Sequence, residues 1–156
     1  MSIDDLAREY ETATEEFLAA VASVDPSLYD HHVEGGWSTR QVVHHVADSE
    51  TQSYARLRRL VAEPPGTVIQ GYDEALWAAS PLLGYQELPI EHSLAVFAAV
   101  RQSSLDILRR LSEGDLEREG VHTESGPYSV RTWIDTYTRH PREHAAQLRE
   151  AAHSKG

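Results

Sequence analysis

The chain contains no cysteine, and this absence removes several kinds of site at once. Without thiols there can be no disulfide framework, no thiolate metal site and no cysteine nucleophile. Any metal ion must therefore be held by histidines or by carboxylates.

Basic residues and long apolar runs are also scarce. The 14 Lys and Arg residues face 25 Asp and Glu residues, which gives a formal net charge of -11. This balance argues against binding nucleic acid or an anionic membrane through an extended basic surface. No stretch approaches the roughly 18 apolar residues of a membrane span, and the N-terminal residues lack the basic and apolar regions of a signal peptide. We therefore expect a cytoplasmic protein.

The residues that are present describe a single helical domain over 1–156, long enough to bury a core. Apolar residues recur at helical spacing in four long segments. A capping box of Ser38 and Gln41 marks the start of the second segment. The segments are 3–23, from Ser38 to about 62, 88–111, and from 129 to about 152. The expected fold is an all-α four-helix bundle with long connections.

The connections carry smaller elements. Residues 63–87 are rich in proline and glycine around the pattern YDEALWAAS, which predicts a long connection with one short extra helix. The stretch HTESGPYS, residues 122–129, is typical of a tight loop or a small hairpin.

The chain has nine histidines, and their positions matter more than their number. His140 and His144 are four positions apart, so they share one helical face and extend the apolar stripe of the last segment. In the second segment His45 falls on the inward stripe, whereas His44 shares a face with Asp48 and is expected to face solvent. Three inward histidines from two helices are a set that binds a divalent metal.

A purely structural role stays open at this stage. A histidine on an apolar face is usually a hydrogen-bonded core residue, and pairs at this spacing arise by chance in a histidine-rich chain. Burying three neutral imidazoles together is nevertheless difficult, because each ring needs both a donor and an acceptor satisfied. A metal ion satisfies one lone pair on all three rings at once.

Pro141 interrupts the last segment beside His140. It lacks the N–H that would bond the carbonyl of Tyr137, and its ring crowds that carbonyl. The sequence therefore predicts a kink that turns His140 toward the other two histidines. The alternative is a tolerated bend in which solvent satisfies the free carbonyl.

Four stretches in order, GGWSTRQVVHHVADSE, YDEALW, LSEGDLEREGVHTESGPYSVRTW and HPREH, resemble the DinB superfamily and, more narrowly, its YfiT-like branch. The resemblance runs from about Gly35 to Leu148. It implies a four-helix bundle, usually a homodimer, with three histidines that hold a divalent ion such as nickel or zinc. The family's ligands fall on His45, His140 and His144. Relatives often have another histidine where this chain has Glu143, and a small residue where it has Pro141.

Such a site leaves at least one coordination position open, so the ion can lower the pKa of a bound water or thiol. Family members are described as metal-dependent hydrolases and as bacillithiol S-transferases. The favoured hypothesis is transfer of a small thiol of the bacillithiol type to an electrophile. The first alternative is hydrolysis by metal-bound water. A third hypothesis, from another class, is a non-catalytic metal-binding bundle of the stress response.

Other candidate residues are less specific. Asp48 and Glu143 lie close to the histidines in sequence, so either is a candidate for the general base or for a group that orients a ligand ring. Four aromatic residues are candidates for a substrate pocket or for the core: Trp37, Tyr72, Trp77 and Tyr137.

Overall fold

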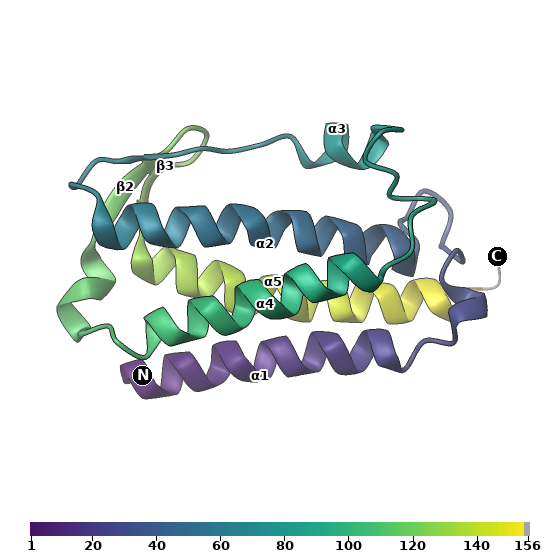
Figure 1. Cartoon of the computed structure of the whole chain (residues 1–156), viewed down its shortest axis with the longest axis horizontal. Coiled ribbons are helices and arrows are strands. Elements are labelled where there is room, and N and C mark those ends of the chain that lie inside the picture. The colour runs from purple at the N-terminus through teal and green to yellow at the C-terminus, as the bar shows by residue number, and fades with distance from the viewer. Residues whose placement is uncertain (155–156) are drawn as a thin grey trace.

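Four long helices lie side by side in the computed structural model, which describes residues 1–154 (Figure 1). They are α1 (Ile3–Ala22), α2 (Thr39–Ala62), α4 (Glu91–Leu108) and α5 (Val130–Ala152). The predicted capping box starts α2: Gln41 N–H donates to Ser38 Oγ at 3.2 Å, and Ser38 N–H donates to Gln41 Oε1 at 2.9 Å. The all-α bundle is confirmed. That it is one domain over 1–156 stays a prediction, and residues 155–156 lie outside the described part.

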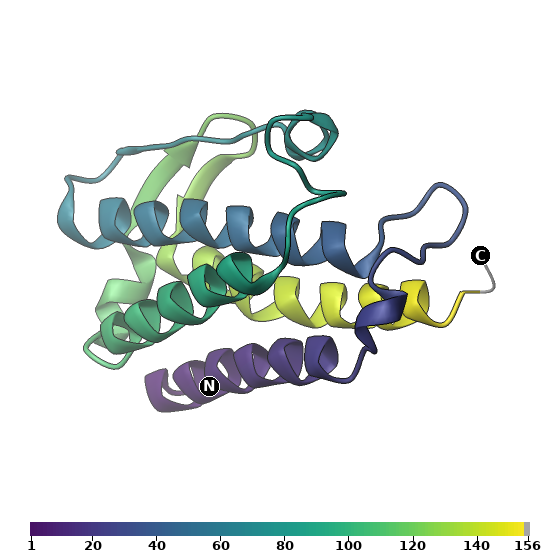
Figure 2. The same cartoon turned by 45° about the vertical axis from the view of Figure 1, so that its right-hand side comes forward.

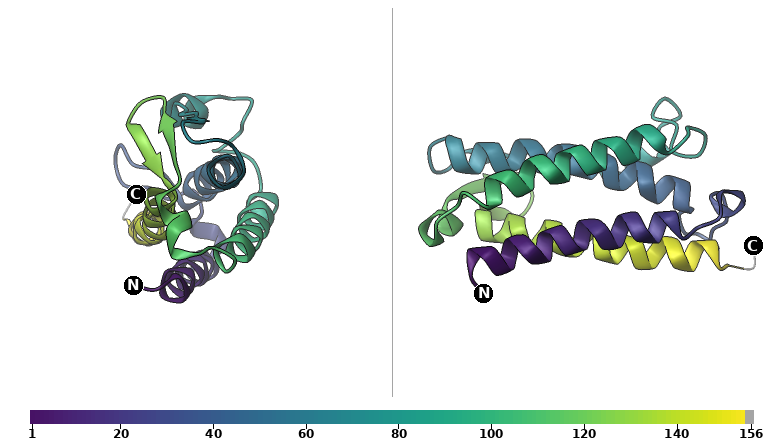
Figure 3. Two further views of the ribbon diagram at one scale, coloured as in Figure 1. Left: turned by 90° about the vertical axis from the view of Figure 1, so that its left-hand side faces the viewer. Right: turned by 60° about the horizontal axis from the view of Figure 1, so that its bottom comes forward.

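The order of the helices around the bundle is not the order of the chain. α1 packs against α4 and α5, and α2 packs against the same two, so α1 and α2 face each other across the diagonal (Figure 3, left). α1 and α5 run in one direction, whereas α2 and α4 run in the other (Figure 1). Because α2 and α4 are parallel neighbours, the chain must return along the whole bundle between them, which explains the long connection.

That connection carries the predicted short helix, α3 (Glu74–Ala79), and a two-residue strand, β1 (Val68–Ile69). β1 pairs in parallel with β2 (Glu119–His122), which forms the predicted hairpin with β3 (Gly126–Ser129) (Figure 2). Gly120 permits this pairing, because a Cβ there would lie 2.5 Å from the carbonyl oxygen of Thr67. β1 is too short to show an alternating pattern, so the sequence did not predict it.

Two short 3₁₀ helices, η1 (Pro26–Leu28) and η2 (Glu113–Glu117), complete the described elements. In the described part of the chain, no helix is both long and apolar enough to cross a membrane.

Buried polar residues separate two apolar clusters along the bundle. Arg101 and Glu50 lie at their centre, only 1% and 0% exposed, with Arg101 Nη1 3.0 Å from Glu50 Oε1. Arg101 also donates to Thr14 Oγ1 at 2.7 Å and to the carbonyl of Tyr10 at 3.0 Å. Ser53 donates to Glu50 Oε2 at 3.0 Å. We call these five residues the Arg101 hub.

The guanidinium of Arg101 also satisfies the carbonyl that Pro141 leaves without its helical hydrogen bond. α5 continues through Pro141 without interruption. The carbonyl of Tyr137, which the missing N–H leaves free, accepts a hydrogen bond from Arg101 Nη1 at 2.6 Å. The partner of this carbonyl is therefore a buried side chain from α4, and solvent is not needed to satisfy it.

Candidate metal centre

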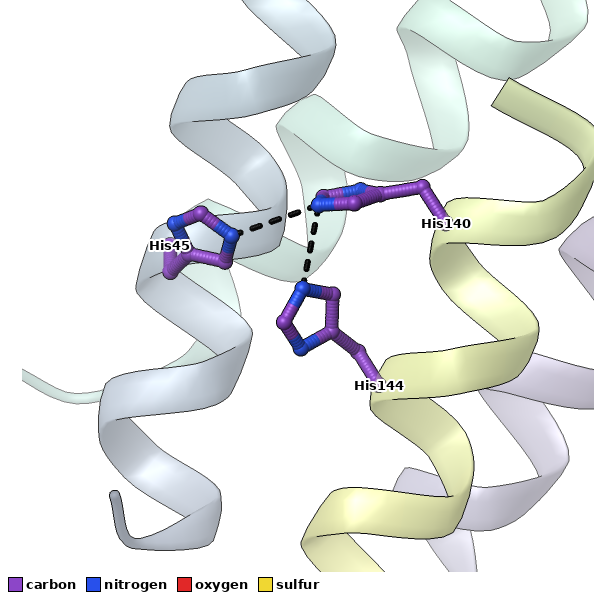
Figure 4. Close-up of side chains that lie close together, drawn as sticks. All are labelled: His45, His140 and His144. Carbon is purple, nitrogen blue, oxygen red and sulfur yellow. Dashed lines mark hydrogen bonds between the residues drawn. The ribbon is translucent and has the colours of Figure 1, made fainter. Parts of the chain in front are cut away.

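Three imidazole rings meet between α2 and α5 (Figure 4). His45 comes from α2, and His140 and His144 come from successive turns of α5. His140 Nε2 lies 3.3 Å from His45 Nε2 and 3.0 Å from His144 Nε2. The structure thus brings together the three residues that the sequence singled out, and we call them the histidine cluster.

The helices place these rings without help from a loop. α2 and α5 are antiparallel neighbours, so the early part of α2 lies against the later part of α5 (Figure 1). His45 is 1% exposed, and its ring packs against Trp37 with 4.9 Å between centroids. His140 and His144 are half-buried. Trp37, a candidate for a substrate pocket, therefore serves as a wall for His45.

Three neutral rings cannot pair all of these nitrogens by hydrogen bonds among themselves. Gln147 Oε1 lies 2.6 Å from His144 Nδ1, so Nδ1 carries the hydrogen and Nε2 presents a lone pair. His140 Nε2 has either one hydrogen or one lone pair, so it cannot complement both neighbouring nitrogens. Nδ1 of His45 and Nδ1 of His140 are buried without a hydrogen-bond partner.

A single cation fits the same positions. Three nitrogens bound to a tetrahedral zinc ion at about 2.05 Å lie about 3.3 Å apart, close to the separations seen here. Imidazole nitrogen also suits nickel, copper and iron. The donor set therefore fits a divalent transition metal, and it leaves which metal open.

The rings are held in the form that binds metal. Burial lowers the pKa of His45 to about 4, with repulsion from His144 as a smaller cause. Burial lowers the pKa of His140 to about 2, with repulsion from His144 and His45 as smaller causes. Burial also lowers the pKa of His144, against a smaller opposing effect of Gln147. All three rings are neutral at pH 7, so their lone pairs are available.

The prediction that His44 faces solvent is wrong. His44 is 5% exposed, with Nδ1 2.7 Å from Ser93 Oγ and Nε2 2.9 Å from the carbonyl oxygen of Leu88. The start of α4 and the segment before it cover this face of α2, which the helical pattern of α2 alone does not reveal. Both nitrogens of His44 are engaged, so this ring is a structural one.

The two carboxylates proposed from sequence, Asp48 and Glu143, bond to residues outside the histidine cluster. Asp48 accepts a short hydrogen bond from the Tyr85 hydroxyl and lines the same hollow as His44. Glu143 is exposed and lies 3.3 Å from Arg139 Nε. Among the described residues, neither carboxylate is hydrogen-bonded to a ring of the cluster, so the base and orienting roles stay predictions without a contact that supports them.

Tyr72 and Tyr137 were named from sequence as candidates for a substrate pocket, but the charged residues Arg56 and Glu74 near the site were missed. A hollow of about 150 Å³ is bounded by His140, and Arg56, Tyr72 and Glu74 are among its lining residues. Tyr72 and Glu74 belong to the YDEALW stretch, which was the available signal. Tyr137 also lines this hollow, whereas Trp77 packs against Tyr72 with 4.6 Å between ring centroids.

Comparison with protein families and curated proteins finds similarity to the DinB superfamily and to proteins named as metal-dependent hydrolases. A family model described as DinB superfamily matches residues 9–148. A protein of Oceanobacillus iheyensis named "Putative metal-dependent hydrolase" is 42% identical over 114 residues, which are 73% of this chain and 64% of that protein. A Bacillus mycoides protein with the same name is 34% identical over 147 residues, 94% of this chain and 83% of that protein. The first match thus spans slightly less than two thirds of its relative.

Two solved structures share the fold. YfiT from Bacillus subtilis, described as "a probable metal-dependent hydrolase with an unusual four-helix bundle topology", aligns with a TM-score of 0.85 at 26% identity, over 96% of this chain and 85% of that chain. TT2238, described as a four-helix bundle protein, aligns with a TM-score of 0.65 at 21% identity, over 95% of this chain and 98% of that chain.

Proposed function

The chain belongs to the DinB superfamily, and from this membership and its three converging histidines we propose that it is a metal-dependent hydrolase. The resemblance to the YfiT-like branch is confirmed. The observation that carries the proposal is the convergence of three Nε2 atoms, which neutral rings alone cannot satisfy. The names of the relatives support hydrolysis over the thiol transfer that the sequence favoured.

The histidine cluster, Gln147 and Trp37 have distinct roles in this proposal. A divalent ion on the histidine cluster supplies Lewis acidity, which makes water nucleophilic near neutral pH and polarises a carbonyl group. Gln147 holds the hydrogen of His144 on Nδ1, which leaves Nε2 free to bind. Trp37 fixes the ring of His45 and keeps water from that side. The substrate class is then a carboxylic ester or amide.

Three protein ligands favour catalysis over a purely structural ion. Structural zinc sites usually have four protein ligands, whereas catalytic sites have three and keep a position for water or substrate. Among residues 1–154, the group able to hold a metal comprises the histidine cluster alone. The non-catalytic metal-binding bundle therefore has less support. The homodimer expected from the family stays a prediction.

Metal analysis tests the site. Protein expressed without a histidine tag should contain about one equivalent of zinc, nickel or a similar ion, and His45→Ala and His144→Ala should lose it. His92→Ala is the matched control, because His92 is exposed and outside the cluster. If wild-type protein stays metal-free after incubation with these ions, the proposal fails.

Product analysis then distinguishes the reactions. The metal-loaded protein is incubated with a panel of esters and amides, with and without added bacillithiol. We expect carboxylic acid products without thiol, and their loss in His144→Ala. Turnover that requires the thiol, and that yields a thioester from these substrates or a thioether from an alkyl halide added with the thiol, would overturn the hydrolase proposal in favour of S-transfer.

A further inference from the structure

The hollow beside His140 is built by four parts of the chain. Its lining includes Ser49 and Arg56 from α2, Tyr72 and Glu74 from the connection, and Tyr137 from α5, together with residues of the β2–β3 hairpin. The connection and the hairpin lie over the α2 side of the bundle (Figures 1 and 2). We call the hollow that these residues line the His140 hollow. Its volume of about 150 Å³ equals roughly five water molecules at about 30 Å³ each, so it fits a ligand of a few heavy atoms.

Arg56 gives this hollow a half-buried positive charge. Its guanidinium donates to the Tyr137 hydroxyl at 3.0 Å and to the carbonyl of Gln70 at 2.8 Å. Its Nε is buried without a hydrogen-bond partner, and no salt bridge joins it to a described carboxylate. The Tyr72 hydroxyl is likewise buried and unpartnered. Leaving such donors unpaired destabilises the protein, so a ligand that supplies an acceptor is favoured here.

Glu74 brings the opposite chemistry to the same hollow. It is an exposed residue among the lining groups, and no described residue donates a hydrogen bond to its carboxylate. Desolvation raises the pKa of Glu74, Arg56 counteracts that shift and Glu124 adds to it. A carboxylate in this setting is an acceptor that a ligand N–H satisfies.

The balance of charge selects among ligands. An anion would be attracted by Arg56 but repelled by Glu74 and Glu124, and a cation would be attracted by the two carboxylates but repelled by Arg56. An uncharged group with both an acceptor and a donor suits both sides. Among hydrolysable groups, a primary or secondary amide is of this kind, whereas an ester has no N–H donor.

Building on the proposed hydrolase function, we propose that the His140 hollow is the substrate pocket and that it takes a small uncharged amide. The amide carbonyl oxygen accepts hydrogen bonds from Tyr72 and Arg56, and the amide N–H donates to Glu74. On hydrolysis a water oxygen bonds to the carbonyl carbon, and the C–N bond breaks with its electron pair left on nitrogen. The proton that water loses passes through Glu74 to that nitrogen.

The test uses N-methylacetamide as the probe and NMR titration as the readout, with both zinc-loaded and metal-free protein. Shifts should centre on the amides of Tyr72 and Glu74 and on the Arg56 Nε–H signal. N,N-Dimethylacetamide lacks the N–H and should bind about tenfold more weakly, the equivalent of one hydrogen bond. Acetate and methylammonium should also bind more weakly. Equal binding of all four probes, or shifts away from the hollow, would overturn the pocket.

Variants separate binding from proton transfer. Glu74→Leu should weaken N-methylacetamide binding about tenfold, whereas Glu74→Gln keeps an acceptor and should restore binding but not amide turnover. Arg56→Met should weaken binding. Exposed residues outside the hollow provide the controls Glu87→Gln and Arg59→Met. Wild-type binding in Glu74→Leu would overturn the role of Glu74.

The failures of the two proposals are distinguishable. Metal-dependent hydrolysis with no amide binding in the hollow refutes the pocket and leaves the function standing. Glu74-dependent amide binding without hydrolysis of any ester or amide supports the pocket and refutes the hydrolase.

Discussion

Two groups of buried polar residues lie between the helices, and they differ in how completely they are satisfied. In the Arg101 hub, the guanidinium and the Glu50 carboxylate are satisfied, because the guanidinium donates to Glu50, Thr14 and two backbone carbonyls, although the Tyr10 hydroxyl is buried without a partner. In the histidine cluster, three nitrogens face one another and two more lack partners. A satisfied buried network stabilises a fold, whereas an unsatisfied one in a native protein calls for a ligand. The hub is therefore structural, whereas the cluster is the candidate metal site.

The largest expected effect comes from removing the charge of the hub. Arg101→Met leaves Glu50 buried without its partner and frees the carbonyl of Tyr137. Breaking a buried ion pair from one side costs about 3–5 kcal/mol, so the free energy of unfolding should fall by that amount. Urea denaturation followed by circular dichroism measures it.

Arg109→Met is the control for this substitution. Arg109 is the C-cap residue that follows α4, and its ion pair with Glu11 is exposed, so the loss should stay below about 1 kcal/mol. If Arg101→Met folds and costs no more than this control, the hub is not structural. If it does not fold, Arg101→Lys, which keeps the charge with fewer donors, should fold with an intermediate loss.

Acidification should destabilise the metal-free protein through the histidine cluster. The pKa of His45 is near 6.5 in the unfolded chain and about 4 in the folded protein. The unfolded state therefore binds the proton first, so stability is present above about pH 6.5 and is lost as the pH falls toward 4. One ring contributes up to about 1.4 kcal/mol per pH unit, roughly 3 kcal/mol in total.

Urea denaturation at several pH values checks this dependence. His45→Gln should flatten the slope between pH 6.5 and 4, and His92→Gln, an exposed control, should leave it unchanged. An unaltered slope in His45→Gln would mean that the buried ring does not couple to folding.

Zinc that binds at the histidine cluster should raise the stability of the folded protein. At free zinc of 100 times Kd, wild-type protein should gain about 2.7 kcal/mol of unfolding free energy. His140→Leu should gain none, because it removes the ring that contacts both others. Thermal denaturation with and without zinc measures both. Equal stabilisation of His140→Leu would place the ion elsewhere.

The smallest effect concerns the group that orients a ring. Gln147→Leu removes the acceptor at His144 Nδ1, so zinc affinity should fall at least tenfold while the stability of the metal-free protein changes little. Zinc titration against a competing chelator reads this out, and Gln102→Leu on the exposed face of α4 is the control. Unchanged affinity would show that Gln147 does not set the ring.

The helices and the three histidines were predictable because both follow helical spacing. The stripe through Trp133, Tyr137, His140 and His144 needs no knowledge of the other helices. His44 was placed wrongly because Leu88 of the connection and Ser93 at the start of α4 cover it, and the local sequence of α2 does not reveal where these residues lie. Arg56 and Glu74 of the His140 hollow were missed for the same reason, since distant segments build it, whereas Tyr72 and Tyr137 had been named as pocket candidates.

The sequence contained an indication of the role of Arg101 that the sequence analysis did not use. It lies four residues after Phe97 and four before Leu105, on the buried face of α4. A charge at a core position requires buried partners, and Pro141 frees a carbonyl that requires a donor. Together they indicate a pairing, although only the packed bundle shows that the two meet.

The parallel arrangement of α2 and α4 has a consequence for assembly. His45 and His140 are 95 positions apart in the chain, and the long return connection lies between them. Of the three histidines in the cluster, only His140 and His144 lie close together in an unfolded chain, so the full site appears after α2 and α5 have docked. Uptake of the ion would thus report that folding is complete, and a chain that ends before α5 would not take it up.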